Sequence, residues 1–274
     1  MADRSFLDWP FFEDRHRAFA AELEAWDDFN ADWRVACEAI PSESHAFHAS
    51  DFFYRSPSGF RKEPYQGWSS DDDERLIGSL IGVIHRHGLE KVGGAVDVEA
   101  FRSYSVGERM FFTGARFEDG EFQTSGSPDR PYFVGFHAAI SNALRLAPDG
   151  ATVHFVFDRN PHHVRWSDEL HRDLILLLER FGTSARQIGR IAFGVAAEEP
   201  GLQAADLRAH LWSQIFEREE GVSEERLGSA ILLEGDSRVH GVFDAQHLEL
   251  SLANLPEETR QALRAFRTTP RIRR

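Results

Sequence analysis

Strand-like and helix-like segments alternate through residues 92–221, and this order constrains the fold more than any other feature of the sequence. Residues 151–158 (ATVHFVFD) are β-branched and aromatic up to Asp158, which is typical of a strand. Strands that alternate with helices pair in parallel through right-handed crossovers. We therefore predict an α/β fold, with strands at 92–98, 151–158 and 188–197 and with helices at 131–146, 167–182 and 202–221.

The residues before this alternation predict two further helices. Apolar residues recur every three or four positions over 13–40, and Pro41 follows them. A second helix is predicted over 71–88, where acidic residues stand at the start and histidines and a glycine at the end, as the helix dipole favours. The apolar face of the first helix is predicted to enter the core with Phe19, Leu23, Trp26, Phe29, Trp33 and Cys37.

Composition excludes several classes of protein. The formal net charge of −14 disfavours broad, non-specific binding of phosphates, although a local basic groove or a bridging metal remains compatible with it. The single cysteine, Cys37, excludes a disulfide scaffold. The apolar stretch at 76–84 is too short for a membrane span, and the chain opens without a signal-peptide pattern. We expect a cytoplasmic protein without membrane contact, and its oligomeric state is left open.

Motifs for nucleotide cofactors and for serine hydrolases are missing. The segment GGAVDVEAF lacks the G-x-G-x-x-G spacing, and no G-x-x-x-x-G-K-[ST] loop occurs. The G-x-S-x-G turn of serine hydrolases does not occur either. We therefore expect no nucleotide cofactor.

Two acidic residues stand out by their positions. Asp158 closes a predicted strand, at the sheet edge where α/β folds bind ligands. Asp206 lies among alanines and leucines on a predicted helix, where a carboxylate is costly unless it is paired or binds a metal. If the two side chains meet, they form the smallest unit that binds Mg²⁺ or Mn²⁺. The alternative is structural: Asp158 caps a turn, and Asp206 pairs with an arginine such as Arg208.

Polar residues beside these two acids extend the candidate site. The loop after Asp158 carries side chains suited to phosphate contact: Arg159, His162, His163 and Arg165. His45, His48 and Asp51 are spaced by three residues, and on a helical turn they would share one face, as zinc ligands do. Hydrogen bonding within a loop is the alternative for these three residues.

The order of several sequence blocks resembles a known family. These blocks are WDDFNADW (26–33), FHASDF (47–52), GAVDVEAF (94–101), PYFVGFHAAI (131–140), VHFVFDRN (153–160) and GLQAADL (201–207), and they are similar to the family called domain of unknown function 3800. The resemblance implies a ribonuclease H-like fold, a mixed sheet flanked by helices, over 26–250. Residues 1–25 would form an atypical helical extension, and residues 251–274 a C-terminal helix and basic tail. The usual first strand, ending in Asp-Glu-Ser-Gly, is not found, so the first strands are expected to be missing.

The resemblance also implies a function. For a bacterial protein of this kind the resemblance implies a nuclease-like metal site, in which Asp158 and Asp206 would be the catalytic ligands of Mg²⁺ or Mn²⁺ and nucleic acid would be the substrate. His48 and Asp51 would lie near the same metal. His137 stands where the family helix supplies an acid, and the first-strand acid is also missing. A catalytically inactive binding module is therefore the alternative.

The C-terminal segments are predicted to add little to the core. Residues 229–236 and 242–255 are interpreted as a peripheral addition, and the basic segment 258–274 is expected to fray.

Overall fold

The protein is a mixed helix and strand protein with two compact units. The computed structural model describes residues 14–115, 117–118, 121–122, 128–148, 150–159, 188–217 and 240–266. Contacts divide the chain into unit 1, Met1–Glu90 with Gly194–Asp236, and unit 2, Lys91–Phe193 with Ser237–Arg274. The expected boundaries at 25 and 250 fall inside helices, and the predicted helix at 167–182 lies outside the described residues.

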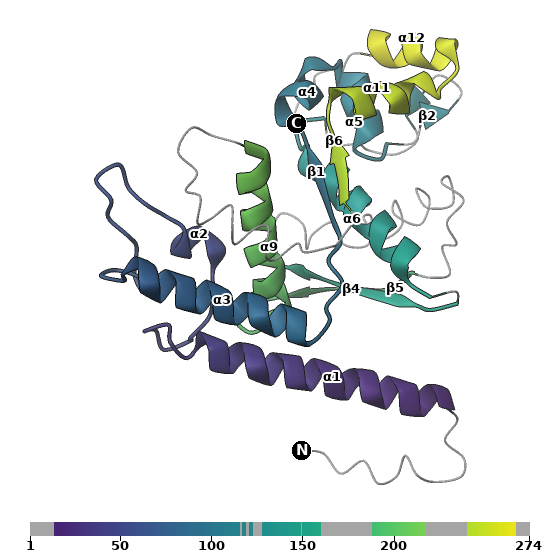
Figure 1. Ribbon diagram of the computed structural model, residues 1–274. Helices are drawn as coiled ribbons and strands as arrows, with labels where there is room; N and C mark the ends of the chain where they lie inside the picture. Colours follow the sequence, from purple (N-terminus) through teal and green to yellow (C-terminus); the bar gives the residue numbers. More distant parts are fainter. Residues whose placement is uncertain are drawn as a thin grey trace, which may run out of the picture. The chain divides into compact units, whose positions relative to one another are not determined.

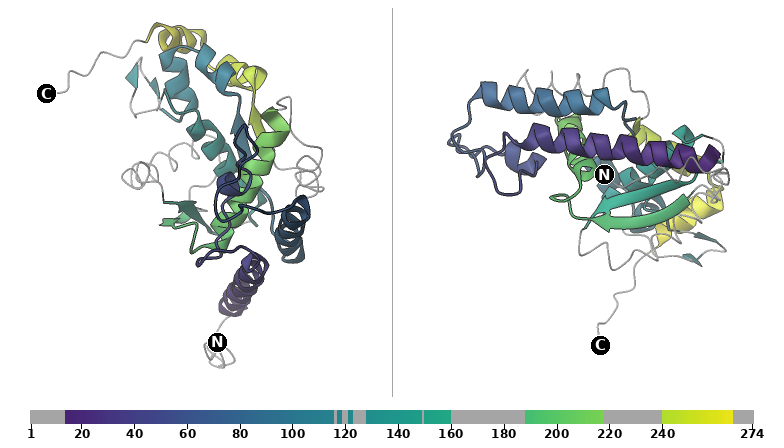
Figure 2. Two further views of the ribbon diagram at one scale, coloured as in Figure 1. Left: turned by 90° about the vertical axis from the view of Figure 1, so that its left-hand side faces the viewer. Right: turned by 90° about the horizontal axis from the view of Figure 1, so that it is seen from below.

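Unit 1 is helical in its described part. It consists of α1 (Asp14–Cys37), α2 (Ala49–Phe52), α3 (Ser70–Arg86) and α9 (Pro200–Glu217), so the helices predicted at 13–40, 71–88 and 202–221 are confirmed. Helices α1 and α3 lie side by side and run in opposite directions (Figures 1 and 2). Helix α9 contacts both α1 and α2.

The core of unit 1 follows from the apolar faces of these helices. Phe29, Trp33 and Cys37 on α1 have exposed fractions of 0%, 0% and 1%, as their spacing predicts. They pack with Leu80 of α3 and Leu207 of α9. The prediction for Trp26 is wrong, because its side chain is 43% exposed although its ring stacks on Phe29. Trp26 lies at the edge of the face that α3 and α9 cover.

A capping box begins α3. The Ser69 hydroxyl accepts from the Asp72 backbone N–H at 3.3 Å, and the Asp72 carboxylate accepts from the Ser69 backbone N–H at 2.9 Å. These bonds satisfy amides that the first turn of a helix leaves without partners. The acidic triplet at 71–73 therefore begins a helix, as predicted.

Unit 2 contains a parallel pair of strands made from segments far apart in the sequence. Strand β1 (Gly93–Val96) pairs with β6 (His240–Phe243), and Gly94 lies opposite Gly241. Helix α6 (Tyr132–Leu146) packs against both strands (Figure 1). The interpretation of 242–255 as peripheral is thus wrong for its first residues, which belong to a sheet. Local patterns in the sequence do not show which distant segment a short strand pairs with.

A second strand pair in unit 2 joins β4 (Val153–Asp158) to β5 (Ile188–Gly194). The side chains of β4 alternate, as a period of two requires: Phe155 and Phe157 pack with Phe136 of α6, and the intervening residues are exposed. A third pair joins β2 (Phe117–Glu118) to β3 (Glu121–Phe122) in antiparallel fashion. Within the described residues the strands pair in twos rather than in one continuous sheet.

Four short helices complete the described part of unit 2. They are α4 (Val98–Ser103), α5 (Val106–Phe112), α11 (Ala245–Ala253) and α12 (Glu257–Ala265). The expectation that 258–274 frays is wrong for residues up to 265, because α12 packs on α5 and fully buries Leu263. The Arg264 guanidinium also donates to the buried carboxylate of Glu108 at 3.0 Å. These contacts explain why this short helix is held in place.

None of the helices in the described part of the chain has both the length and the apolar composition that a membrane crossing needs.

Candidate functional site

A buried glutamine on α9 organises the loop that carries the predicted ligands of unit 1. The side-chain oxygen Oε1 of Gln203 accepts from Trp33 Nε1 at 3.0 Å and from the Phe47 backbone N–H at 2.9 Å. Its Nε2 donates to the carbonyl of Ala196 at 2.8 Å. Gln203 is 4% exposed, so these bonds replace those that water would make. It therefore fixes α1 and the start of the loop to α9.

Asp206, one helical turn after Gln203, holds the next part of the same loop. Its Oδ2 accepts from the Ala49 backbone N–H at 2.8 Å, at the start of α2. The same oxygen lies 3.5 Å from His48 Nδ1, and the Asp206 side chain is 36% exposed. The bond to Ala49 gives Asp206 a structural role at the start of α2. The Arg208 guanidinium lies 4.9 Å from the centre of the Trp212 ring.

Asp51 and Lys62 form an ion pair beside these residues. Lys62 Nζ donates to Asp51 Oδ1 at 3.0 Å and also lies 4.8 Å from the centre of the Tyr54 ring. Asp51 belongs to α2, the helix whose first amide Asp206 binds. One short helix thus connects the two predicted acidic ligands of unit 1.

The predicted zinc ligands do not share a helical face. Helix α2 spans only Ala49–Phe52, and His45 lies before it with a positive φ of 44°. The Nδ1 atom of His45 lies 2.7 Å from the Ile40 carbonyl oxygen, so this side chain serves a turn. Of the three residues, only His48 lies within 4 Å of the Asp206 carboxylate in the ion pairs recorded for the described residues. That part of the chain holds no group of three or more His, Cys, Asp or Glu side chains suited to a metal ion.

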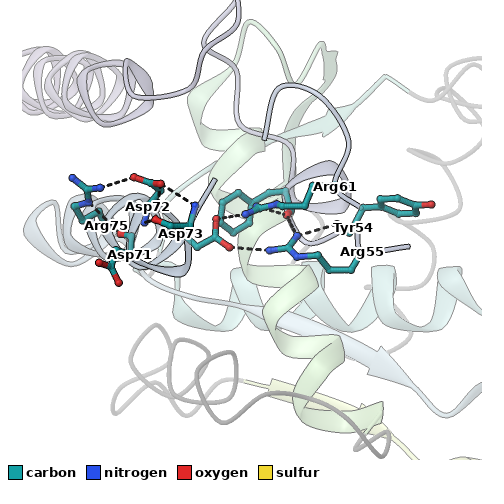
Figure 3. Close-up of polar contacts among 9 residues, drawn as sticks. Tyr54, Arg55, Arg61, Asp71, Asp72, Asp73 and Arg75 are labelled. Atoms are coloured by element: carbon teal, nitrogen blue, oxygen red, sulfur yellow. Dashed lines mark hydrogen bonds and ion pairs between the residues drawn. The ribbon is translucent and has the colours of Figure 1, made fainter. Parts of the chain in front are cut away.

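A buried ion-pair network fixes the other end of the loop. Asp73 of α3 accepts from Arg55 at 2.8 Å and from Arg61 at 2.7 Å, one arginine on each carboxylate oxygen (Figure 3). Both arginines also donate to the carbonyl of Phe52, at the end of α2. The Arg61 side chain is only 8% exposed, so its charge depends on Asp73 for compensation.

Asp158, the strongest candidate in unit 2, is exposed at the carboxyl end of β4, as predicted. Burial, and secondly the charge of Asp158, raise the pKa of the nearby Tyr132 phenol. Arg159 follows Asp158 and is also exposed. His162, His163 and Arg165 lie outside the described residues. Asp158 belongs to unit 2, and Asp206 belongs to unit 1.

His137 is a partly buried imidazole on α6. Burial lowers the pKa of His137 to about 4, so the side chain is neutral at pH 7. A Cβ atom on Gly114, which has a φ of +94°, would lie 2.6 Å from His137 Cε1. The position where an acid was expected is therefore a tightly packed neutral histidine.

Sequence reasoning missed Tyr54, Lys62 and the pairing of Asp73 with two arginines. The signal that could have found Lys62 is its rarity, since Lys62 and Lys91 are the only lysines of the chain. Asp73 was interpreted only as a helix-start residue, because a sequence does not show which arginine a carboxylate will reach.

No family model matches the chain, and neither a curated protein nor a solved structure matches it. The similarity to the family called domain of unknown function 3800 therefore stays a prediction. It is based on the order of the sequence blocks alone.

Proposed function

We propose that the protein is a divalent-metal-dependent nuclease of ribonuclease H-like type, which hydrolyses phosphodiester bonds of nucleic acid. The observation that carries the proposal is the position of the Asp206 carboxylate, which is both hydrogen-bonded and partly exposed. One of its oxygens is held by the Ala49 amide at 2.8 Å, the side chain is 36% exposed, and His48 Nδ1 lies 3.5 Å away. A carboxylate that is oriented by the backbone and still reaches solvent is suited to bind a cation.

The carboxylate of Asp206 fits Mg²⁺ or Mn²⁺ in kind, because both ions prefer oxygen donors. His48 lies beside this carboxylate as a positioning group, with an imidazole that suits Mn²⁺ better than Mg²⁺. The resemblance implies Asp158 as a further catalytic carboxylate. Mg²⁺ in enzymes commonly keeps several waters and takes one or two carboxylates together with substrate phosphates. A bound cation of this type would activate water and neutralise phosphate charge, which would offset part of the repulsion between phosphate and a chain with a net charge of −14.

The residues of the chain have distinct roles in this proposal. Gln203 holds the loop against α9 through Phe47, so that His48 lies beside Asp206. The ion pair with Lys62 holds Asp51 at the edge of the same surface. Such fixed supporting bonds keep ligands in position, and their loss typically weakens metal affinity by about 10–100-fold.

The decisive experiment compares Asp206→Asn with the wild type in cleavage of a labelled oligonucleotide with Mn²⁺. Asparagine keeps an oxygen that accepts from the Ala49 N–H, so α2 stays capped while the negative charge is lost. We expect cleavage to fall by more than about 100-fold, beyond the loss that supporting residues cause, and the same for Asp158→Asn. Asp244→Asn is the matched control, because Asp244 caps α11 as Asp206 caps α2 and is not among the proposed metal ligands. Wild-type activity in both variants would contradict the proposal.

A binding module without catalysis is the second candidate. The specific observation in its favour is Lys62, whose ammonium group already lies 3.0 Å from Asp51 and neutralises it. Calorimetric titration of the wild type with Mn²⁺ separates the two functions. Saturable binding that Asp206→Asn abolishes supports the nuclease, and the lack of saturable binding at millimolar Mn²⁺ supports the binding module.

A further inference from the structure

The segment between α2 and α3 has a composition unlike the rest of this acidic chain. Residues 54–62 (YRSPSGFRK) include three basic and two aromatic side chains and no acidic one, in a chain with a net charge of −14. Basic side chains interleaved with aromatic ones are the combination that binds single-stranded nucleic acid without sequence preference. We call the side chains of Tyr54 and Lys62, together with Phe60 of the adjoining turn, the Tyr54 surface.

Hydrogen bonds at both ends hold the backbone that carries the Tyr54 surface. At one end, Arg55 and Arg61 both bind Asp73 and the Phe52 carbonyl. At the tip, Ser56 closes a turn: its backbone N–H donates to the Phe60 carbonyl at 2.9 Å, and its hydroxyl accepts from the Phe60 N–H at 2.9 Å. Binding to a surface ordered in advance avoids the entropy cost of fixing a loop.

Both rings of the Tyr54 surface are exposed, unlike the buried aromatic residues around them. Tyr54 is 40% exposed and Phe60 53%, whereas Phe52 and Tyr65 are each 1% exposed. Figure 3 shows the Tyr54 ring beyond Arg55 and Arg61, on the side of Asp73 away from Asp71 and Asp72. The exposed ring therefore lies beside Arg55 and Arg61, whose charges Asp73 compensates, and away from Asp71 and Asp72.

Lys62 joins the Tyr54 surface to the proposed metal site. Its side chain is 50% exposed, and its ammonium group lies 4.8 Å from the centre of the Tyr54 ring and 3.0 Å from Asp51. Asp51 lies on α2, the helix that Asp206 caps. A phosphate that approaches the surface would compete with Asp51 for the Lys62 ammonium group, and a base beside it would meet the Tyr54 ring.

We propose that the Tyr54 surface binds single-stranded nucleic acid, with bases stacked on Tyr54 and Phe60 and a backbone phosphate on Lys62. The proposal rests on the proposed function for the chemistry of the ligand, because a strand held here would lie next to Asp51 and Asp206. It does not depend on hydrolysis or on a bound metal.

The test measures binding of a fluorescein-labelled oligothymidine of about 12 nucleotides by fluorescence anisotropy, with the full chain in EDTA. We expect Tyr54→Ala and Phe60→Ala each to weaken binding by about tenfold, as the loss of one base–aromatic stack does, and Tyr54→Phe to bind as the wild type does. Lys62→Gln should reduce the slope of log K against log salt by about 0.7, the contribution of one phosphate contact on a single strand. Lys91→Gln is the matched control and should keep the wild-type slope.

The outcomes separate this proposal from the proposed function. Oligonucleotide binding that depends on Tyr54, found in a protein that cleaves nothing with Mn²⁺, supports the Tyr54 surface and contradicts the nuclease. Mn²⁺-dependent cleavage together with wild-type binding by both alanine variants overturns the Tyr54 surface alone. A wild type that does not bind the oligonucleotide at low salt also overturns it, and the exposed rings would then point to a protein partner.

Discussion

Gln203 and Asp206 of α9 bind two backbone amides that are themselves two residues apart, those of Phe47 and Ala49. Residues three apart on a helix lie on one face, about 4.5 Å apart along its axis. Alternate amides of an extended segment point to the same side, about 6.6 Å apart. The flexible side chains of Gln203 and Asp206 make up the difference between these two spacings. The Gln-x-x-Asp spacing therefore matches an extended segment that lies along the helix.

Replacing Gln203 with leucine should destabilise unit 1. The substitution leaves the N–H groups of Trp33 and Phe47 buried without an acceptor, which we expect to lower the free energy of unfolding by about 3 kcal/mol. Urea unfolding followed by circular dichroism and tryptophan fluorescence measures the change. Gln246→Leu is the control: Gln246 is exposed on α11, so the change should stay within about 0.5 kcal/mol. Equal midpoints for the two variants would refute the role of Gln203.

Asp73→Ala should cost more stability than Asp72→Ala, although the two residues are neighbours on α3. Asp73 compensates the buried charge of Arg61, and removing one partner of a buried pair costs about 3 kcal/mol, whereas Asp72 pairs with the exposed Arg75. Thermal unfolding of the two variants under one buffer condition provides the comparison. If Asp72→Ala proves equal or worse, the Asp73 network does not hold the loop.

The stability of unit 2 should depend on pH through His137. Its pKa is lowered from 6.5 to about 4 by burial. Between these two pH values the unfolded chain binds a proton that the folded chain does not, so stability is complete above pH 6.5 and decreases as the pH falls toward 4. The total effect is at most about 3 kcal/mol. His137→Phe should flatten this part of the profile in unfolding experiments between pH 4 and 7, and an unchanged slope would argue against a neutral buried imidazole.

Alanine substitutions at two glycines should have opposite effects. A Cβ on Gly94 would lie 2.2 Å from the carbonyl oxygen of Gly135, so Gly94→Ala must separate β1 from α6 and destabilise the protein. Gly78 lies in the middle of α3 with nothing within 4 Å of an added Cβ. Gly78→Ala should therefore stabilise by up to about 1 kcal/mol, the difference in helix propensity. Melting temperatures give the sign of each effect, and a stabilising Gly94→Ala would show that the close contact is absent.

Local sequence patterns were sufficient to predict the helices and strands that are determined by neighbouring residues. The apolar period of α1 with its terminal Pro41, the capping residues of α3 and the β-branched run of β4 each act within a few residues, so a sequence shows them. The candidate ligands in the described residues are located as expected in part: Asp158 ends β4, and His48 lies beside Asp206. The position of Asp158 depends only on the neighbouring residues, whereas the contact of His48 with Asp206 joins distant segments and depends on tertiary structure.

Tertiary structure alone decided the remaining features, because they depend on contacts between distant segments. The β1–β6 pairing joins residues separated by more than a hundred positions, the burial of Leu263 orders a helix that composition predicts to fray, and Trp26 is left exposed at the edge of an otherwise buried face. The same holds for Asp73, which reaches two arginines instead of only beginning a helix. Hydrophobic spacing determines which side of a helix is buried, but the partner that covers it is chosen by the packing of the whole unit, where burial and charge compensation are satisfied together.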